Sequence, residues 1–344
     1  MRRLNILIWH IHGSYLNALA RLEHNWYLPV RAGRPEGYGG RGRTFDWPER
    51  VCEVAADEVR DLELDLIIYQ TAKNLVEDAP AILTAAQRAL PSIYLEHNTP
   101  RPHASDTRHP VDDPSVLLVH VTRYNRLMWD NGRTPAVVVE HSVAIDPAVR
   151  YSGALCRGIT VVNGLQRRPR IAGYDLFLKA RQSVPLDAAG METEAFGGLG
   201  DIPYRDLHRR VAEYRFLFSP IRYTSLPLAV IEAMTLGMPV VALATTELPT
   251  VIEHGRTGFI SCDLDELVDS MRWLLTHEAD ARRLGARARE VATRRFGLDR
   301  FARGWNAAFE RAAALRPDAP VKHLSAGRRR AAVGTPHDGR ADHG

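Results

Sequence analysis

Residues 215–244 read RFLFSPIRYTSLPLAVIEAMTLGMPVVALA, and this stretch decides the fold. Two apolar runs, RFLFSP (215–220) and PVVALA (239–244), have the length and composition of buried strands. Between them, LPLAVIEAMTLG (226–237) has helical character. The order strand, turn, helix, strand predicts one βαβ unit with parallel strands.

Both ends of the expected helix carry their own signals. Thr224 and Ser225 are N-cap candidates, and Pro227 suits a position near the first helical residue. Gly237 ends the helix, and Pro239 prevents its continuation. A helix that begins at the carboxyl end of a parallel strand presents free N–H groups and a positive dipole end, an arrangement that suits a phosphate.

The same alternation of apolar runs and helical stretches occupies most of the chain. Continuously apolar strands separated by helices indicate parallel sheets covered on both faces, so we expect a doubly wound α/β fold. The other expected strands are NILIW (5–9), LDLIIY (64–69), SIYLEH (92–97), LLVHVT (117–122), AVVVEH (136–141) and ITVVNG (159–164).

The pattern restarts near residue 150, after HSVAIDP (141–147), which predicts two Rossmann-like domains. We expect residues 1–148 to form the first domain and 149–297 the second. The apolar stripe of a final helix, 298–315, could pack on either one. Residues 316–344 contain almost no large apolar residue, so this tail is expected to be disordered.

Composition narrows the possible partners. The chain has 344 residues, 45% of them hydrophobic, and a formal net charge of +4. This mild charge does not indicate nucleic-acid binding, whereas an anionic small substrate or peripheral contact with an anionic membrane fits it. The three cysteines are far apart and suggest neither disulfides nor zinc, and the apolar run near Met1 is too short for a signal peptide or a membrane span. We therefore expect a cytoplasmic protein, with membrane association at the inner face left open.

Glu232 is the charged residue that stands out in the helix, because Leu228, Val230, Ile231 and Ala233 surround it. A carboxylate is costly to bury unless donors satisfy it, and the two hydroxyl groups of a ribose would do so. The alternative is a structural salt bridge to a nearby arginine.

A polar segment, RAGRPEGYGGRGRTFDWP (31–48), is rich in glycine and arginine. One interpretation is a floppy surface loop, and the other is a mobile lid over a substrate. Two interpretations also exist for the arginine cluster of the tail, a solvated tail or a contact with a membrane or partner. The cluster consists of Arg328, Arg329 and Arg330.

Residues 219–260, SPIRYTSLPLAVIEAMTLGMPVVALATTELPTVIEHGRTGFI, resemble the donor-binding region of retaining glycosyltransferases with the GT-B fold, family 4 of the sequence classification. That family usually shows P-S-x-x-E-G-F-G-L-x-x-x-E-A-M-A-x-G-x-P-V-V-A and later P-E-x-I-x-x-G-x-T-G. The whole chain also resembles glycosyltransferases of actinobacteria. The matches in register are Ser219, Pro220, Leu228, Glu232, Ala233, Met234, Gly237, Pro239, Val240, Val241, Ala242, Pro249, Gly255, Thr257, Gly258 and Phe259.

The resemblance implies a role for each matching position of this motif. Glu232 would hydrogen-bond the nucleotide ribose. Thr224 stands where the family has a glutamate that touches the transferred sugar, so sugar contacts here must differ. Ser225, Leu226 and Leu228 occupy the turn whose N–H groups meet the diphosphate.

Elsewhere the likeness is weaker. If Gly173-Tyr174-Asp175 is the family's Gly-x-Asp, its diphosphate-binding lysine is replaced by Ala172. Arg168 and Arg170 are the favoured substitutes, with Arg222 as a further candidate and solvated arginines as the alternative.

In the first domain, YLEHN (94–98) resembles the strand end whose histidine faces the sugar, so His97 is the catalytic candidate. IWHIHGS (8–14) resembles the first strand and its turn, where Gly13 would allow close approach to the diphosphate. His10 and His12 are less certain, because neighbouring positions of a strand point to alternate faces.

The sequence therefore predicts a glycosyltransferase that moves a sugar from a UDP- or GDP-sugar to an unidentified acceptor, retaining its configuration and needing neither metal nor cofactor. A nucleotide-sugar-binding protein with lost or altered turnover is one alternative. A GT-B-like sugar-nucleotide epimerase is another, and Glu96 and Glu140 are its only candidate acid/base residues.

Overall fold

The computed structural model describes residues 2–316 and contains two parallel sheets. Every strand pairing in both sheets is parallel. The expected α/β fold is therefore confirmed. The first sheet has the order β3-β2-β1-β4-β5-β6-β7, with β1 (Asn5–Ile8), β2 (Asn25–Val30), β3 (Val51–Ala55), β4 (Leu66–Tyr69), β5 (Ser92–Glu96), β6 (Val116–His120) and β7 (Ala136–Val138).

The second sheet belongs to the second half of the chain. All of its strands come after residue 150, where the sequence pattern restarts. Its order is β12-β11-β10-β8-β9, with β8 (Leu155–Val161), β9 (Leu186–Ala189), β10 (Tyr214–Ser219), β11 (Val240–Leu243) and β12 (Gly258–Ser261).

Four strands were missed by the sequence pattern, namely β2, β3, β9 and β12. Three of them, β3, β9 and β12, are edge strands. An edge strand pairs on one side only, so it does not need the continuous apolar run that marks a central strand. β2 contains Pro29 within its apolar run, which argued against a strand.

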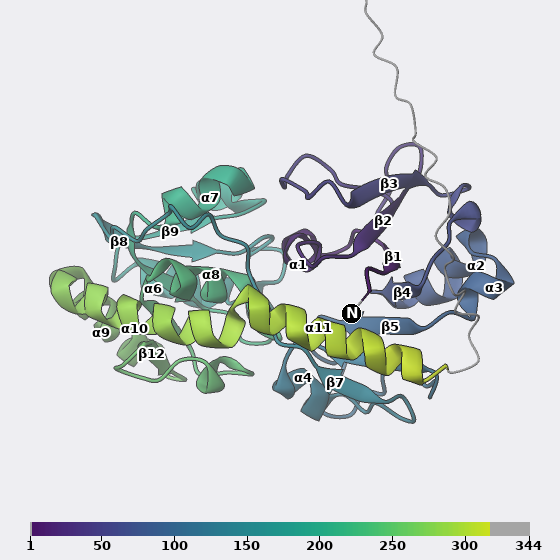
Figure 1. Cartoon of the computed structure of the whole chain (residues 1–344). Coiled ribbons are helices and arrows are strands. Elements are labelled where there is room, and N and C mark those ends of the chain that lie inside the picture. The colour runs from purple at the N-terminus through teal and green to yellow at the C-terminus, as the bar shows by residue number, and fades with distance from the viewer. Residues whose placement is uncertain (1, 317–344) are drawn as a thin grey trace, which may run out of the picture.

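The two domains lie side by side, and the helices pack around their sheets (Figure 1). The helices are α1 (Gly13–Leu19), α2 (Ala79–Ile82), α3 (Ala85–Arg88), α4 (Arg123–Met128), α5 (Pro169–Ala172), α6 (Tyr174–Arg181), α7 (Tyr204–Val211), α8 (Leu228–Leu236), α9 (Leu264–Thr276), α10 (Glu278–Phe296) and α11 (Leu298–Ala314). Single turns are η1 (Val59–Asp61), η2 (Asn74–Asp78), η3 (Thr193–Phe196) and η4 (Leu248–Thr250).

The helix of the opening stretch, α8, begins later than its capping signals predict. Its N-cap is Pro227, and no side chain caps it, so Thr224 and Ser225 were wrong as N-caps. Proline disfavours helical geometry in the residue before it, here Leu226, which holds the turn extended up to residue 227. Gly237 ends the helix as expected, with a left-handed φ of 90°.

The final helix joins the two domains. α10 packs on the second domain through Ala288, Ala292 and Phe296. Gly297 is extended and separates α10 from α11, which then runs along the first domain (Figure 1). The expected apolar stripe of α11, including Phe301, lies in the core of the first domain, and this answers which domain it covers. The tail from residue 317 onward, with Arg328 to Arg330, lies outside the described residues.

Candidate active site

One large cavity of about 910 Å³ lies between the two domains. The first domain contributes the turn between β1 and α1 and part of the segment 31–48. The second domain contributes the ends of β8 and β9, the start of α7 and the first turns of α8. The lining residues are 10–15, 43–45, 161–163, 190–191, 201–205, 207, 228–229 and 232.

Helix α8 brings Glu232 to the wall of this cavity. Leu228 and Ala229 line it at the first turn of the helix, and Glu232 follows one turn later. The rest of the helix is deeply buried, because it packs between the second sheet and α10. Glu232 is 8% exposed, and its carboxylate therefore sits at the boundary between the protein core and the cavity.

The buried carboxylate of Glu232 has few donors. Its Oε1 lies 3.5 Å from Nε2 of His208 on α7, and that nitrogen makes no hydrogen bond of normal geometry. Tyr204 is its other polar neighbour: burial and the adjacent negative charge of Glu232 raise the pKa of the phenol. Among residues 2–316 no arginine forms a salt bridge with Glu232, so the structural alternative is not seen there. The carboxylate keeps capacity for further donors.

Two of the three candidate arginines of the second domain are held by Asp175. Arg222 binds both carboxylate oxygens at 2.6 and 2.8 Å, and Arg170 binds one at 2.7 Å. The hydrogen bond from Arg222 is the main cause that lowers the pKa of Asp175. Neither Arg170 nor Arg222 lines the cavity, so the structure does not bring them to Glu232.

Arg168 does not line the cavity either, but it bonds a residue that does. Its Nη2 donates to the backbone oxygen of Asn163 at 3.2 Å, and Asn163 lines the cavity. Burial lowers the pKa of Arg168, and the positive charges of Arg101 and Arg167 lower it further. Positive charge thus gathers here, with Arg101 coming from the first domain.

The turn before α8 is less accessible than expected. Ser225 and Leu226 are buried, and neither they nor Thr224 line the cavity. The backbone oxygen of Ser225 accepts a hydrogen bond from Oγ1 of Thr246. Gly13 does line the cavity. The group that approaches it closely is a side chain of the protein, because a Cβ at this position would lie 2.6 Å from Cε2 of Phe45.

His97 lies behind another histidine, His12. Their ring centroids are 4.1 Å apart, and only His12 lines the cavity. Nε2 of His97 lies 3.0 Å from Oε1 of Gln70, whose amide nitrogen donates to the backbone oxygen of Trp9. This series of hydrogen bonds places the proton of His97 on Nε2, because the facing amide oxygen of Gln70 can only accept.

These histidines are neutral near pH 7. Burial lowers the pKa of His12 to about 4 and holds that of His97 well below its ordinary value. Burial also lowers the pKa of His141 to about 3, and its ring packs edge-on against Tyr15 at 5.6 Å. A neutral imidazole can donate or accept a hydrogen bond without adding charge to the cavity.

Sequence reasoning missed several residues here. His10 and His12 were ranked below His97, although both line the cavity and His97 does not. Tyr204, Phe45 and Arg101 carried no motif. The sequence offered one hint for Arg101, its position four residues after His97. In the structure the segment next to Arg101 contacts the second domain, where the hydroxyl of Tyr223 donates to the backbone oxygen of Pro100 at 3.1 Å.

The carboxylates that an epimerase would need are engaged elsewhere. Glu96 accepts from the backbone N–H of Asn98 at 2.6 Å and lies 3.2 Å from His109. Glu140 forms a 2.6 Å ion pair with Arg295, beside the junction of α10 and α11. Neither carboxylate lines the cavity between the domains.

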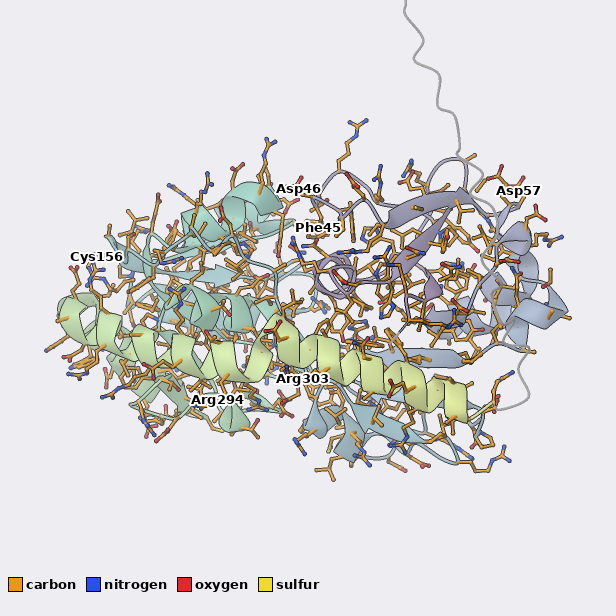
Figure 2. The ribbon with its side chains drawn as sticks, in the orientation of Figure 1. Phe45, Asp46, Asp57, Cys156, Arg294 and Arg303 are labelled. Carbon is orange, nitrogen blue, oxygen red and sulfur yellow. The ribbon has the colours of Figure 1, made fainter. Side chains whose placement is uncertain are left out.

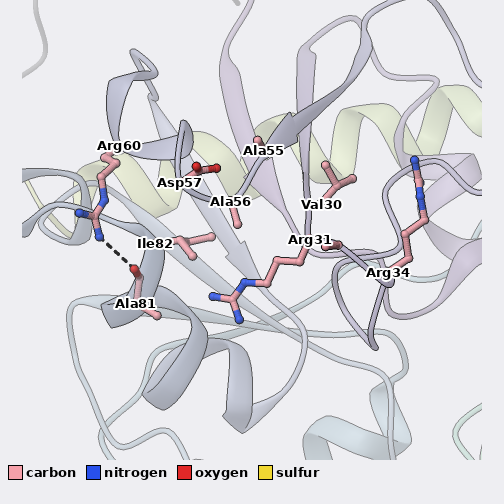
Figure 3. A pocket seen from close by; sticks show the side chains of 10 residues that line it. Val30, Arg31, Arg34, Ala55, Ala56, Asp57, Arg60, Ala81 and Ile82 are labelled. Carbon is pink, nitrogen blue, oxygen red and sulfur yellow. Dashed lines mark hydrogen bonds between the residues drawn. The ribbon is translucent and has the colours of Figure 1, made fainter.

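A second hollow, of about 650 Å³, lies on the first domain alone (Figure 3). It is formed by the carboxyl ends of β2 and β3 together with α2. Arg60 donates across it to the backbone oxygen of Ala81 at 3.0 Å. Arg31 stacks on the ring of Tyr38, with its guanidinium carbon 4.1 Å from the ring centroid. None of its lining residues belongs to the second domain.

Within residues 2–316, no three histidine, cysteine, aspartate or glutamate side chains gather in a way that could hold a metal ion. In the same range, no helix is both long and apolar enough to cross a membrane.

The second domain matches a known family. Residues 168–277 match the model of the family described as "Glycosyl transferases group 1". Over 69 residues the chain is 36% identical to the trehalose synthase of Pyrococcus horikoshii. The matched stretch is 20% of this chain and 17% of that protein. The chain thus spans only a small part of that relative.

Solved structures that hold UDP or a UDP-sugar share the fold. HepE of Anabaena in complex with UDP-glucose superposes with a TM-score of 0.65 at 14% identity, covering 90% of this chain and 100% of that one. TarM of S. aureus superposes with a TM-score of 0.58 at 13% identity, covering 71% of this chain and 55% of that one. These likenesses establish the arrangement of two parallel-sheet domains as GT-B. The chain therefore has the GT-B fold, and its residues 168–277 are similar to the glycosyl transferases group 1 family.

Proposed function

We propose that this protein is a glycosyltransferase that transfers a sugar from a UDP- or GDP-sugar to an acceptor held by the first domain. The observation that carries the proposal is Glu232, a buried carboxylate on the wall of the interdomain cavity with spare acceptor capacity. Two vicinal ribose hydroxyls would donate to its oxygens. The complex of HepE with UDP-glucose supports a nucleotide sugar as donor.

The diphosphate would follow from the ribose toward the N-terminus of α8. The free N–H groups of residues 228 and 229 would face it, and the helix dipole favours negative charge there. Pro227 lacks an N–H, so one donor is lost at this position. Arg168 and Arg101 would add positive charge at the same side of the cavity.

The sugar would then face the first domain. His12 lies on the cavity wall, so it would orient a sugar hydroxyl, and His97 would act as the residue that positions His12. As the bond to the diphosphate breaks, negative charge grows on the leaving group. The dipole of α8 and the arginines would stabilise that charge without a metal ion. Retention of configuration rests on the family resemblance alone.

The test is a thermal-shift panel of UDP, GDP and ADP, followed by turnover of the matching nucleotide sugars with and without EDTA. We expect one diphosphate to raise the Tm and its sugar conjugate to be hydrolysed or transferred at an unchanged rate in EDTA. No shift with any nucleotide would overturn the proposal. A shift without turnover would favour the alternative, a nucleotide-sugar-binding protein, and a loss of rate in EDTA would contradict metal independence.

Peripheral contact with an anionic membrane is part of the same proposal, because the chain carries a formal net charge of +4. Cosedimentation with phosphatidylglycerol vesicles, compared with phosphatidylcholine vesicles, tests it. Equal recovery with both would contradict a role for negative lipid charge.

A further inference from the structure

The segment 31–48 is a folded part of the first domain. Two of its glycines form isolated bridges, with Gly37 pairing to His10 and Gly39 to Val30. Glu53 of β3 accepts from Arg34 at 2.9 Å and from the backbone N–H of Arg41 at 2.7 Å.

The base of the segment is also fixed. Nε1 of Trp47 donates to the backbone oxygen of Arg41 at 2.6 Å. The ring of Trp47 packs edge-on against His10 at 5.5 Å, beside the turn that lines the cavity. A floppy loop would lack these anchors, so the segment has the rigidity needed to position a side chain.

The positioned side chain is Phe45. Residues 41–44 and Asp46 are exposed, whereas Phe45 is half-buried between Gly13 and Tyr204. The rings of Phe45 and Tyr204 meet edge to face, with centroids 4.6 Å apart. Phe45 belongs to the first domain and Tyr204 to the second, and Figure 2 labels Phe45 and Asp46 where the segment approaches that domain.

Tyr204 continues this contact to the carboxylate. Its ring packs against His208 at 4.9 Å, and His208 lies 3.5 Å from Glu232. Burial and the negative charge of Glu232 also raise the pKa of Tyr204, which shows that the two side chains are neighbours. The aromatic contact between the domains therefore ends at the residue that would hold the ribose.

We infer that Phe45 is a positioning residue of the donor site: it packs on Tyr204 of the second domain at the wall of the cavity and fixes the aromatic surface beside the ribose-binding carboxylate. This inference rests on the proposed function, because it takes a nucleoside diphosphate as the ligand. It assigns part of the donor site to the first domain, in a segment without a family motif. Since the contact joins two domains, it forms only when they are closed on each other.

The test uses UDP as the probe, or GDP if the nucleotide panel favours it. Phe45→Ala removes the ring, and Asp46→Ala is the matched control on the neighbouring exposed residue. An aromatic pair that is lost together with its burial weakens binding by about tenfold. We expect Phe45→Ala to raise the Kd of the nucleotide and the KM of its sugar donor by about that factor, and Asp46→Ala to change neither.

A double-mutant cycle separates this role from a general loss of stability. Phe45→Leu and Tyr204→Leu should each weaken nucleotide binding, and the double variant should be little worse than either one. Multiplicative effects, or unchanged Kd and KM in Phe45→Ala, would overturn the inference. If Phe45→Ala does not fold, Phe45→Leu, with its Tm measured without nucleotide, gives the decision. Failure of the wild type to bind any nucleotide would instead reject the proposed function itself.

Discussion

The two domains line the same cavity with different kinds of groups. The second domain brings a buried carboxylate and a helix N-terminus, both from one continuous stretch around α8. The first domain brings neutral histidines and an aromatic segment, which no single motif joins: His12 lies in the turn after β1, His97 follows β5, and Phe45 belongs to the segment 31–48. The difference shows that the carboxylate and the helix N-terminus of the proposed donor half follow from one local stretch, whereas the histidines and Phe45 are brought together only by folding.

Trp305→Ala tests whether α11 belongs energetically to the first domain. Trp305 is fully buried there and donates from Nε1 to the hydroxyl of Tyr15 at 3.2 Å. Truncating a buried tryptophan costs about 3–5 kcal/mol, so urea denaturation should show that loss. Hydrogen exchange should rise in β5 and β6 and stay unchanged in β10 and β11. Equal deprotection of both sheets would show that the domains unfold as one unit.

Glu232→Gln tests the chemistry of the second domain. Hydrogen bonds to a charged acceptor contribute about 1.5–3 kcal/mol each, so the affinity for the bound nucleotide should fall about 100-fold in calorimetry. The Tm without nucleotide should not fall, because the carboxylate has few donors to lose. Glu253→Gln, at an exposed carboxylate of the same domain, is the control. A lower Tm with unchanged affinity would make Glu232 a structural residue.

Acid should weaken the first domain. His120 and His141 are buried, with pKa values lowered to about 4 and about 3. Below pH 6.5 each histidine takes up a proton in the unfolded chain and not in the folded one. The free energy of unfolding therefore falls as the pH is lowered. Each contributes a loss of about 1.4 kcal/mol per pH unit until its folded pKa is reached.

The measurement is the urea midpoint at pH 7.0, 6.0 and 5.0. His141→Asn should reduce the loss of stability between pH 6.0 and 5.0 by about 1.4 kcal/mol, the contribution of one histidine over one pH unit. His254→Asn in the second domain, whose ring Nδ1 lies 2.7 Å from the backbone oxygen of Ile260, is the comparison. The same pH slope in wild type and His141→Asn would exclude His141 as a source of the acid sensitivity.

The two adjacent histidines should differ in function. His12→Ala should lower kcat by about tenfold, consistent with one lost transition-state hydrogen bond to the sugar. His97→Gln, which keeps a side chain that can bond Gln70, should lower it less. Steady-state kinetics with the donor identified by the panel would show this order. The reverse order would return the catalytic role to His97.

The smallest effect is expected from Thr224→Glu. Thr224 does not line the cavity, so nucleotide affinity should change less than about threefold. The family resemblance puts a glutamate that touches the sugar at this position, so restoring it should shift the choice among donor sugars. Competition between UDP-glucose and UDP-N-acetylglucosamine measures that choice. An unchanged donor profile would remove Thr224 from the sugar site.

Much of the second domain could be predicted from sequence. The βαβ unit, the end of α8 at Gly237 and the position of Glu232 all follow from residues close together in the chain. The start of α8 was misplaced, because the extended turn imposed by Pro227 outweighed the capping preference of Thr224 and Ser225.

The rest depends on contacts that no local pattern encodes. Which histidine reaches the cavity is decided by the packing of His12 over His97. Arg170 and Arg222 were plausible phosphate ligands until folding placed Asp175 between them. Phe45 gained its place only because α7 of the other domain lies opposite.

The most direct test of the account is calorimetric binding of UDP and of 2′,3′-dideoxy-UDP to the wild type and to Glu232→Gln, with the guanine pair measured in parallel. If Glu232 holds the ribose, the wild type should prefer the nucleotide with ribose hydroxyls by about 100-fold, as expected for two lost hydrogen bonds to a carboxylate. Glu232→Gln should bind both forms with similar, weak affinity. Equal affinity of the wild type for both forms would contradict the central claim that Glu232 holds the ribose of a nucleotide sugar.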